Sequence, residues 1–410
     1  MFSERTAWPR GLNRLTLALE EAKRRGGGLL DLTASNPTSV GLKYDEKAIL
    51  HALAAAEAMQ YHPEPKGLAT AREAVAEYYR DTVARRLARC APPQPGQPLW
   101  DRPEPPRLDA ERIVLTVSTS EAYSFVFRLL CDPDDEILVP QPSYPLLEYL
   151  ARLEAVRLVP YPLFYDHGWQ IDLHALRRAI SRRTRAVVLV HPNNPTGSYV
   201  LRRERSVLDG LCAENELALV VDEVFLDYAL EPREDAAGSF AYHREAMTFT
   251  LSGVSKISGL PQMKLAWIVV SGPEPQAREA MARLEMVADT FLSQNAPVQL
   301  AAPAMLKARG AIQAQLGERL RRNLAELDRQ LHEHPACERL AVEGGWCVIL
   351  RVPATRSDEE LVLALLAEQQ VLVQPGYFYD FAQDGYLVLS LITPSEIFRE
   401  GVRRVLGMVE

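Results

Sequence analysis

Three polar side chains follow apolar runs at places from which they could act together. Lys256 lies in a glycine-bearing loop between two apolar runs, Asp222 follows the run Leu217–Val221, and Asn194 follows the run Ala186–Val190. A lysine at a partly desolvated site loses its proton more easily, and its amine can then form a Schiff base with a carbonyl near neutral pH. A lone loop lysine is usually a solvated side chain, so the interpretation depends on all three positions together.

A second set of residues indicates an anion site. Ser118, Thr119 and Ser120 follow the apolar run Ile113–Val117 and stand at the start of a predicted helix. Backbone N–H groups and hydroxyls at a helix N-terminus bind anions, although a simple helix cap gives the same pattern. Lys264, in the same loop as Lys256, would supply a second positive charge to such an anion.

The apolar runs predict an α/β fold that brings these residues to one edge of a sheet. Seven predicted strands alternate with helical stretches, which is typical of a mostly parallel sheet covered by helices on both faces. Ligands of open α/β sheets bind at the carboxyl ends of the strands, so we expect the site there. A long helical section from residue 298 then leads to a smaller α+β unit. The predicted strands are Ile113–Val117, Ile137–Val139, Ala155–Val159, Ala186–Val190, Leu217–Val221, Met247–Leu251 and Leu265–Val270.

Composition excludes several classes of protein. The 410 residues carry a net charge of −8, which argues against a nucleic-acid surface. Apolar runs are too short to span a bilayer, and the N-terminal residues lack a signal-peptide core. The five cysteines are scattered without Cys-x-x-Cys spacing, which favours free thiols over disulfides or a zinc site. We therefore expect a cytoplasmic protein without a catalytic metal.

The order Asn194, Asp222, Lys256 resembles the fold-type I pyridoxal-phosphate-dependent enzymes, and specifically their class I/II aminotransferases. The resemblance extends over nearly the whole chain and implies the cofactor pyridoxal 5'-phosphate and the PLP-dependent transferase fold. It implies an N-terminal arm that is part of the small domain (1–45), a large cofactor-binding domain (46–297) and a small C-terminal domain (298–410). The implied reaction moves an amino group between an amino acid and a 2-oxo acid through a Schiff base at Lys256.

The resemblance also implies a role for each candidate residue. Lys256 binds the cofactor and moves the substrate proton, and Asp222 pairs with the pyridine nitrogen, so these two are the expected catalytic residues. Asn194 donates to the phenolic oxygen of the cofactor, and Tyr144 stacks on its ring. The phosphate is expected to contact Ser118, Thr119, Ser120 and Lys264, and also Tyr61 from the neighbouring subunit of a homodimer.

Three positions depart from the family pattern near the cofactor. Phe225 stands where the family has a tyrosine that donates to the phenolic oxygen, and it is expected to contact the cofactor without that hydrogen bond. Lys264 replaces an arginine, which keeps the charge but loses the bidentate fork. Gly253 stands where the family tends to have a serine, and whether Ser255 or Ser252 takes over its part is open.

A fourth departure concerns the substrate. Val388 occupies the place of the arginine that binds the substrate α-carboxylate in the family, in a strand reading roughly Arg-x-Ser. Either another group binds the carboxylate or the substrate presents something else there. The candidates that the sequence offers for such a group are Asn36, Lys43, Arg351 and Arg399.

Two other functions stay open on sequence alone. A PLP-dependent decarboxylase or β-lyase would keep the same cofactor site, and the loss of the arginine at Val388 keeps this alternative alive. A non-catalytic PLP-binding regulatory module is more remote, because the short segment before Asn36 contains no basic helix-turn-helix.

Overall fold

The computed structural model describes residues 1–8, 11, 13–26, 28–90, 106–231 and 233–409. Its main feature is an eight-stranded sheet with the strand order β2-β9-β8-β7-β6-β3-β4-β5. The strands are β2 (Ile113–Thr116), β3 (Glu136–Gln141), β4 (Arg157–Tyr165), β5 (Trp169–Ile171), β6 (Thr184–Val190), β7 (Ala218–Asp222), β8 (Thr248–Gly253) and β9 (Ala266–Ser271).

The centre of this sheet is parallel. β4, β3, β6, β7 and β8 pair with their neighbours in parallel, so their carboxyl ends lie at one edge. β9 is antiparallel to both β8 and β2, and β2 therefore runs in the same direction as the parallel strands. The predicted α/β fold class is confirmed, and the sheet has one strand, β5, beyond the seven predicted. β5 has only three residues, too few for an alternating pattern to reveal it.

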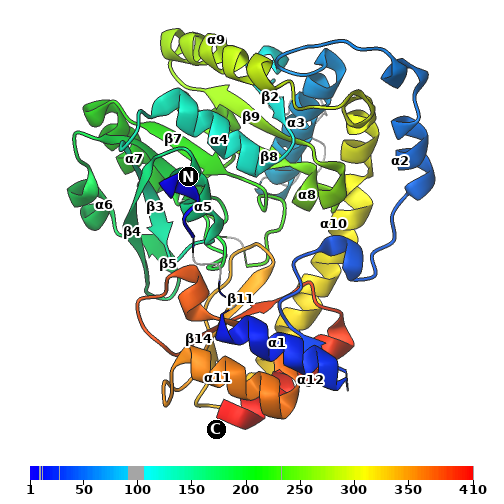
Figure 1. Ribbon diagram of the computed structural model, residues 1–410, viewed down its shortest axis with the longest axis vertical. Coiled ribbons are helices and arrows are strands. Elements are labelled where there is room, and N and C mark those ends of the chain that lie inside the picture. Colours follow the sequence, from blue (N-terminus) through cyan, green and yellow to red (C-terminus); the bar gives the residue numbers. More distant parts are fainter. Residues whose placement is uncertain (9–10, 12, 27, 91–105, 232, 410) are drawn as a thin grey trace, which may run out of the picture.

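Helices cover both faces of the large sheet (Figure 1). Alternate residues of one strand face opposite ways, and β2 illustrates this: Val114 packs into one hydrophobic cluster, while Ile113 and Leu115 pack into another. One face is covered by α4 (Thr119–Leu130), α5 (Leu146–Leu153) and α9 (Glu274–Phe291). The other is covered by α2 (Glu46–Leu53), α3 (Ala69–Cys90), α6 (Leu173–Ala179), α7 (Arg202–Asn215) and the first part of α10 (Ala296–Leu331).

A smaller unit is built on a four-stranded sheet with the order β10-β11-β14-β13. The N-terminal segment belongs to it, because β1 (Leu30–Asp31) pairs with β12 (Val371–Leu372) and Leu32 is buried in the same cluster as Phe398. Its remaining elements are α1 (Arg14–Arg25), β10 (Glu338–Arg339), β11 (Cys347–Arg351), α11 (Asp358–Ala364), β13 (Gln374–Pro375), β14 (Tyr386–Ser390) and α12 (Ser395–Val409).

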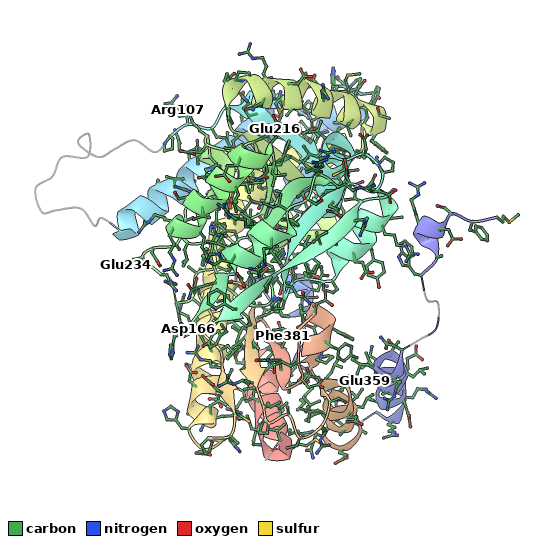
Figure 2. All side chains as sticks on the ribbon, turned by 90° about the vertical axis from the view of Figure 1, so that its left-hand side faces the viewer. Arg107, Asp166, Glu216, Glu234, Glu359 and Phe381 are labelled. Atoms are coloured by element: carbon green, nitrogen blue, oxygen red, sulfur yellow. The ribbon has the colours of Figure 1, made fainter. Side chains whose placement is uncertain are left out.

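The two units share one long helix. The first part of α10 packs with the large sheet through Met305, and the later part packs in the core of the small unit through Leu320. Figure 1 shows α10 running from the upper unit to the lower one. The units also meet near Phe381, labelled in Figure 2, whose ring lies 6.1 Å from that of Trp169 on β5. Among the described residues, no helix has the length and hydropathy needed to cross a membrane.

Candidate active site

A cleft lies between the carboxyl edge of the large sheet and the small unit. About 1270 Å³ of its space holds no protein atoms, and this volume includes open solvent. Asp222, at the end of β7, and Lys256, just after β8, both line it, as does Asn194 in the loop after β6. Thr33, Ala34 and Ser35 of the N-terminal segment also line the cleft. The strand ends therefore bring together side chains that are far apart in the sequence.

Lys256 lies in the short helix α8 (Val254–Ile257), which follows β8 directly. Its Nζ lies 4.8 Å from the centroid of the Trp346 ring and 5.7 Å from the centroid of the Phe225 ring. The same nitrogen donates to the backbone oxygen of Ser35 at 3.4 Å. Burial lowers the pKa of Lys256, which favours the neutral amine. The lysine is therefore placed to act as a nucleophile or a base.

Asp222 is a carboxylate at a buried strand end. Its Oδ1 accepts from the Val224 N–H at 3.1 Å, and its Oδ2 accepts from the Tyr123 hydroxyl at 3.3 Å. Burial raises the pKa of Asp222 to about 6, while these two hydrogen bonds and the charge of Lys256 act to lower it. A carboxylate held in this way is stabilised by any cationic group that a ligand brings beside it.

The N-terminus of α4 forms another wall of the cleft. Thr119 and Ser120 line the cleft, whereas Ser118 caps the helix, with its Oγ accepting from the Glu121 N–H at 3.2 Å. The first turn of α4 presents backbone N–H groups and hydroxyls, the arrangement that binds an anion. Ser255 lines the cleft as well.

The loops after β6 and β3 hold Asn194 and Tyr144 at the cleft. The two loops are tied together by Asn193, whose Nδ2 donates to the Pro142 oxygen at 3.1 Å. Gly197 has a φ of +71°, and a Cβ built on it would lie 2.6 Å from the Gly344 oxygen of the small unit. This glycine therefore lets the loop after β6 approach the small unit closely.

The replacement of a serine by Gly253 has a steric reason. A Cβ at this position would lie 2.9 Å from the Cβ of Ala266 on the adjacent strand β9. A side chain at position 253 would therefore crowd the residues Leu265 and Ala266 at the start of β9. Ser255 lines the cleft and Ser252 does not, although Ser252 Oγ is buried without a hydrogen-bond partner among the described residues.

Four predicted site residues do not line this cleft. Ser118 is the helix cap described above, and Lys264 is exposed with a φ of +53°. Asn36 is also exposed, and its Oδ1 accepts from the Thr38 N–H at 3.0 Å. Tyr61 is 80% exposed and lines a separate hollow with Ser293. Their predicted contacts with cofactor or substrate stay predictions.

Several residues that line the cleft were missed by the sequence analysis. Tyr123 could have been found, because it lies on α4 four residues after Thr119 and three after Ser120, on the same face of the helix. Five others come from the small unit, where no local pattern marks them. These are Trp346, Cys347, Gln374, Tyr379 and Ser390.

Val388 is fully buried and packs in a hydrophobic cluster with Ile349 and Tyr379. The arginines that the sequence offered as replacements point elsewhere: Arg351 forms an ion pair with Glu338, and Arg399 with Glu396. Lys43, like these two arginines, is absent from the cleft wall. Among the described residues that line the cleft, Lys256 is the only lysine or arginine.

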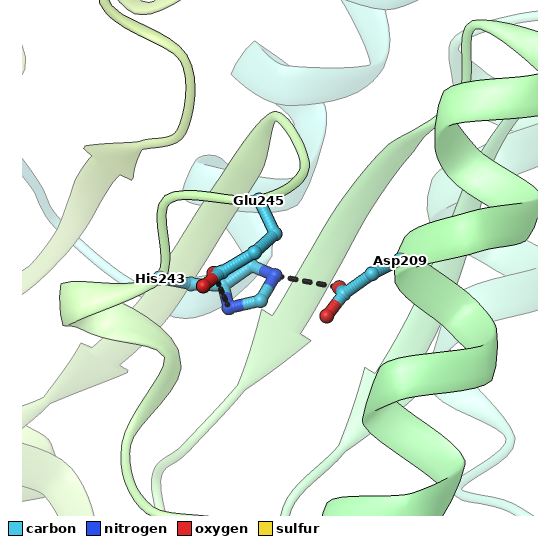
Figure 3. A group of neighbouring side chains, drawn as sticks. All are labelled: Asp209, His243 and Glu245. Atoms are coloured by element: carbon cyan, nitrogen blue, oxygen red, sulfur yellow. Dashed lines mark hydrogen bonds and ion pairs between the residues drawn. The ribbon is translucent and has the colours of Figure 1, made fainter.

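A second cluster of titratable side chains lies away from the cleft (Figure 3). His243 Nε2 lies 2.7 Å from Asp209 Oδ1, and His243 Nδ1 lies 3.1 Å from Glu245 Oε2. The two carboxylates thus approach different nitrogens of one ring, and a single metal ion cannot bind both nitrogens. The hydrogen bond between His243 and Asp209 anchors the segment before β8 to α7.

Comparisons with known proteins agree with this geometry. The glutamate-pyruvate aminotransferase of Escherichia coli is 25% identical over 383 residues, covering 91% of this chain and 89% of the relative. The alanine aminotransferase of Mycobacterium tuberculosis is 25% identical over 386 residues, covering 93% and 85%. The solved structure of alanine aminotransferase from Pyrococcus furiosus superposes with a TM-score of 0.84 at 22% identity, covering 100% of this chain and 99% of that one.

The family model of class I and II aminotransferases matches residues 29–399, which include the large unit, most of the small unit and every residue of the cleft named above. The relatives are matched over most of their own length, so the likeness is not confined to one motif. The chain belongs to the class I and II aminotransferases, and it is an aminotransferase with the PLP-dependent transferase fold.

Proposed function

We propose that this aminotransferase binds pyridoxal 5'-phosphate in the cleft through Lys256 and exchanges amino groups between an amino acid and a 2-oxo acid. The observation that carries the proposal is the meeting of Lys256 and Asp222 in one partly aromatic cleft. The relatives' names, glutamate-pyruvate and alanine aminotransferase, support this general class of substrates.

The residues of the cleft fit the cofactor. Burial raises the pKa of Asp222 to about 6, and a protonated pyridine nitrogen beside this carboxylate would stabilise its charged form. Thr119 and Ser120 at the N-terminus of α4 would hold the phosphate. Asn194 would donate to the phenolic oxygen, and the exposed ring of Tyr144 would lie against the cofactor. Phe225 would add an apolar contact.

The chemistry divides between the cofactor and the chain. When bound, pyridoxal phosphate supplies an electron-withdrawing ring that stabilises negative charge on the substrate carbon next to the amine. Asp222 favours the protonated ring by its negative charge, and the Tyr123 hydroxyl holds that carboxylate in place. Lys256 Nζ, made less basic by burial, accepts the proton of the substrate carbon and later returns it. Trp346 and Phe225 shield this amine from water.

We also propose that the enzyme is a homodimer in which Tyr61 reaches the cofactor phosphate of the neighbouring subunit. Tyr61 is 80% exposed, and Met59 beside it is 90% exposed. Large exposed apolar side chains of this kind are typical of a surface that a partner covers. The hollow that Tyr61 lines also contains Leu292 and Ser293, which follow α9.

A labelling experiment tests the proposed attachment of the cofactor. The purified protein is loaded with pyridoxal phosphate, reduced with borohydride and digested, and the modified peptide is sequenced by mass spectrometry. We expect the label on Lys256 in the native chain and a loss of the label in a Lys256→Ala variant. A label on any other residue, or a protein that stays colourless after loading, contradicts the proposal.

The reaction type is tested on the same loaded protein. Single-turnover mixing with an amino donor should convert the bound cofactor to its pyridoxamine form and release the matching carbonyl compound. Release of carbon dioxide or of pyruvate with ammonia, without that conversion, would instead indicate decarboxylation or β-elimination at the same site.

A further inference from the structure

The cleft contains two charged side chains, and the proposed function uses both of them. Among the described residues that line the cleft, Asp222 and Lys256 are the only aspartate, glutamate, lysine, arginine or histidine. Asp222 would stabilise the cofactor ring, and Lys256 would act at the reacting carbon of the donor. A charged group on the side chain of a donor would therefore lose hydration in this cleft without gaining an ion pair, which is costly.

The wall that α5 contributes to the cleft is apolar. It is lined by Leu146, Leu147 and Leu150. Leu150 follows Leu146 by four residues and Leu147 by three, which places the three side chains along one face of the helix. Leu147 is buried in the core, whereas Leu146 remains 37% exposed. An apolar group of a ligand that covers Leu146 would be stabilised by the removal of both surfaces from water.

The loop that leads into α5 connects this apolar wall with the proposed cofactor site. Tyr144, which is proposed to lie against the cofactor, stands two residues before Leu146, lines the same cleft and is 47% exposed. The preceding residue, Ser143, donates its backbone N–H to the Tyr379 oxygen at 3.0 Å, which ties the loop to the small unit. The start of α5 therefore lies next to the place proposed for the cofactor, in the part of the cleft that remains for a substrate.

The other walls of the cleft offer polar groups without charge. Residues 33–35 of the N-terminal segment contribute two hydroxyls, and the small unit contributes groups such as the indole of Trp346 and the amide of Gln374. Neutral donors of this kind can bind the α-carboxylate, which every amino acid carries and which therefore does not distinguish one donor from another. The side chain of the donor meets either the leucines of α5 or neutral groups, whichever wall it approaches.

We propose that the preferred amino donor of this enzyme is an amino acid with an extended apolar side chain, and that Leu146 is a residue that determines this preference. The inference rests on the proposed function, because the donor must react at Lys256. It narrows the substrate class within that function. Amino acids with a charged side chain lack an ionic partner in the cleft, and those with a very short side chain leave Leu146 uncovered.

The test compares L-norvaline with L-alanine, which is shorter by two methylene groups, and with L-glutamate, which carries a carboxylate in place of the terminal methyl group. Each donor is mixed with the cofactor-loaded native enzyme under single-turnover conditions, and the rate of conversion of the bound cofactor is measured against donor concentration. We expect kcat/KM for L-norvaline to exceed that for each of the other two donors by on the order of tenfold. L-alanine or L-glutamate reacting as fast as L-norvaline, or faster, overturns the inference.

Substitutions on α5 test the role of Leu146 in this preference. Leu146→Ala is expected to lower the ratio of kcat/KM for L-norvaline to that for L-alanine by roughly threefold or more. Leu146→Arg adds a cation to the wall and is expected to raise kcat/KM for L-glutamate relative to L-norvaline by on the order of tenfold. Leu153→Ala is the matched control, because Leu153 lies on the same helix and is 41% exposed but does not line the cleft. Native ratios in both Leu146 variants, or an equal fall in the control, would contradict the role of Leu146.

A binding measurement gives a readout that does not depend on turnover. Pentanoate, propanoate and glutarate correspond to the three donors without the amine, and they are titrated into the loaded enzyme by calorimetry. Tightest binding of pentanoate supports the inference, and equal or tighter binding of propanoate or glutarate overturns it. If no donor converts the cofactor and borohydride labels no lysine, the proposed function itself fails. A labelled Lys256 with a preference for L-alanine or L-glutamate contradicts only the donor assignment.

Discussion

At the scale of single residues, Asp222 and Glu223 are adjacent acids in different surroundings. Asp222 lines the cleft, whereas Glu223 is buried behind it and accepts from the Phe240 N–H and from the Ser239 hydroxyl. Burial raises the pKa of Glu223 to about 8, and the neighbouring Asp222 acts in the same direction. At neutral pH the side chain of Glu223 is therefore mostly protonated and acts as a neutral hydrogen-bonding group.

This difference predicts that two isosteric substitutions change the rate of amino transfer to very different extents. Asp222→Asn removes the charge that would stabilise the protonated cofactor ring, and we expect a loss of amino transfer by on the order of 10²-fold or more. Glu223→Gln keeps an oxygen that accepts from the Phe240 N–H, and its amide N–H can donate to the Ser239 oxygen in place of the bond that Ser239 donates to Glu223, so activity should stay within about threefold. The measurement is single-turnover conversion of the bound cofactor. Similar losses in both variants would contradict the assignment of Asp222.

The raised pKa of Glu223 also predicts a pH dependence of stability. Between the ordinary pKa of 4.5 and the folded value of about 8, the folded chain holds a proton that the unfolded chain has lost, so the free energy of unfolding decreases as pH rises. One such proton contributes at most about 1.4 kcal/mol per pH unit. We expect Tm to fall from about pH 5 to about pH 8, and Glu223→Gln to flatten this slope. An equal slope in the variant would show that other groups carry it.

Whether the sequence indicates that a residue lies at the cleft depends on where that residue stands relative to the strands. Asp222, Asn194 and Lys256 could be predicted because each follows a continuous apolar run, and the ends of parallel strands meet at one edge. Gln374 and Tyr379 could not, because they lie in a short strand and a turn of the small unit. Only the pairing of β13 with β14 brings Gln374 to the cleft.

At the scale of elements, the loop after β6 contacts the small unit through a backbone hydrogen bond between two glycines, Gly344 and Gly197. The Gly344 N–H donates to the Gly197 oxygen at 2.9 Å, and Gly197 has a φ of +71°. A Cβ at Gly197 would also lie 2.7 Å from Val342 Cγ2. The loop that carries Asn194 therefore depends on a backbone contact that a side chain would prevent.

We predict that Gly197→Ala lowers the free energy of unfolding by roughly 1–3 kcal/mol from backbone strain, with a further cost from the clash with Gly344. The same variant should bind the cofactor less tightly, because the loop carries Asn194. Gly210→Ala is the matched control: Gly210 lies in α7, a Cβ added to it meets nothing within 4 Å outside the backbone of its own helix, and alanine there should stabilise by roughly 0.5–1 kcal/mol. Chemical denaturation of the three proteins measures both effects. A Gly197→Ala variant as stable as the native chain would contradict the prediction.

Long elements were predicted more reliably than short ones. The helical section predicted to begin at residue 298 starts within two residues of the start of α10 (Ala296–Leu331), because its apolar positions recur over many turns. β5 and β13 have three and two residues, and their pairing depends on distant segments. Such strands leave no periodic signal in the sequence.

At the scale of the whole molecule, the N-terminal segment and α10 both connect the two units. Trp8 packs on Tyr149 of α5 in the large unit, with ring centroids 5.6 Å apart, while Leu15 of α1 lies in the core of the small unit. We propose the domain division 1–45, 46–297 and 298–410. The first part of α10 then packs against the large domain although it follows the proposed boundary, so the small domain is not expected to fold alone.

The proposed homodimer predicts complementation between two defective chains. Lys256→Ala removes the reactive amine of its own site, and Tyr61→Ala removes the side chain proposed to act in the partner's site. In a mixed dimer, one of the two sites has Lys256 from one chain and Tyr61 from the other, and is complete. After equal amounts of the two variants are mixed and allowed to exchange subunits, we expect roughly a quarter of the native activity per chain to return.

The controls distinguish a Tyr61 that acts in the site of the partner subunit from a Tyr61 that acts in the site of its own chain. Each variant alone should stay well below the activity of the mixture, and the double variant Lys256→Ala/Tyr61→Ala mixed with either single variant should restore none. If Tyr61 acted only on the site of its own chain, every mixed dimer would hold one site without Lys256 and one without Tyr61. Activity would then not exceed the average of the two single variants. That outcome would contradict the shared site. A monomer by analytical ultracentrifugation at the assay concentration would also contradict it, because the exposed Tyr61 would then have no subunit to reach.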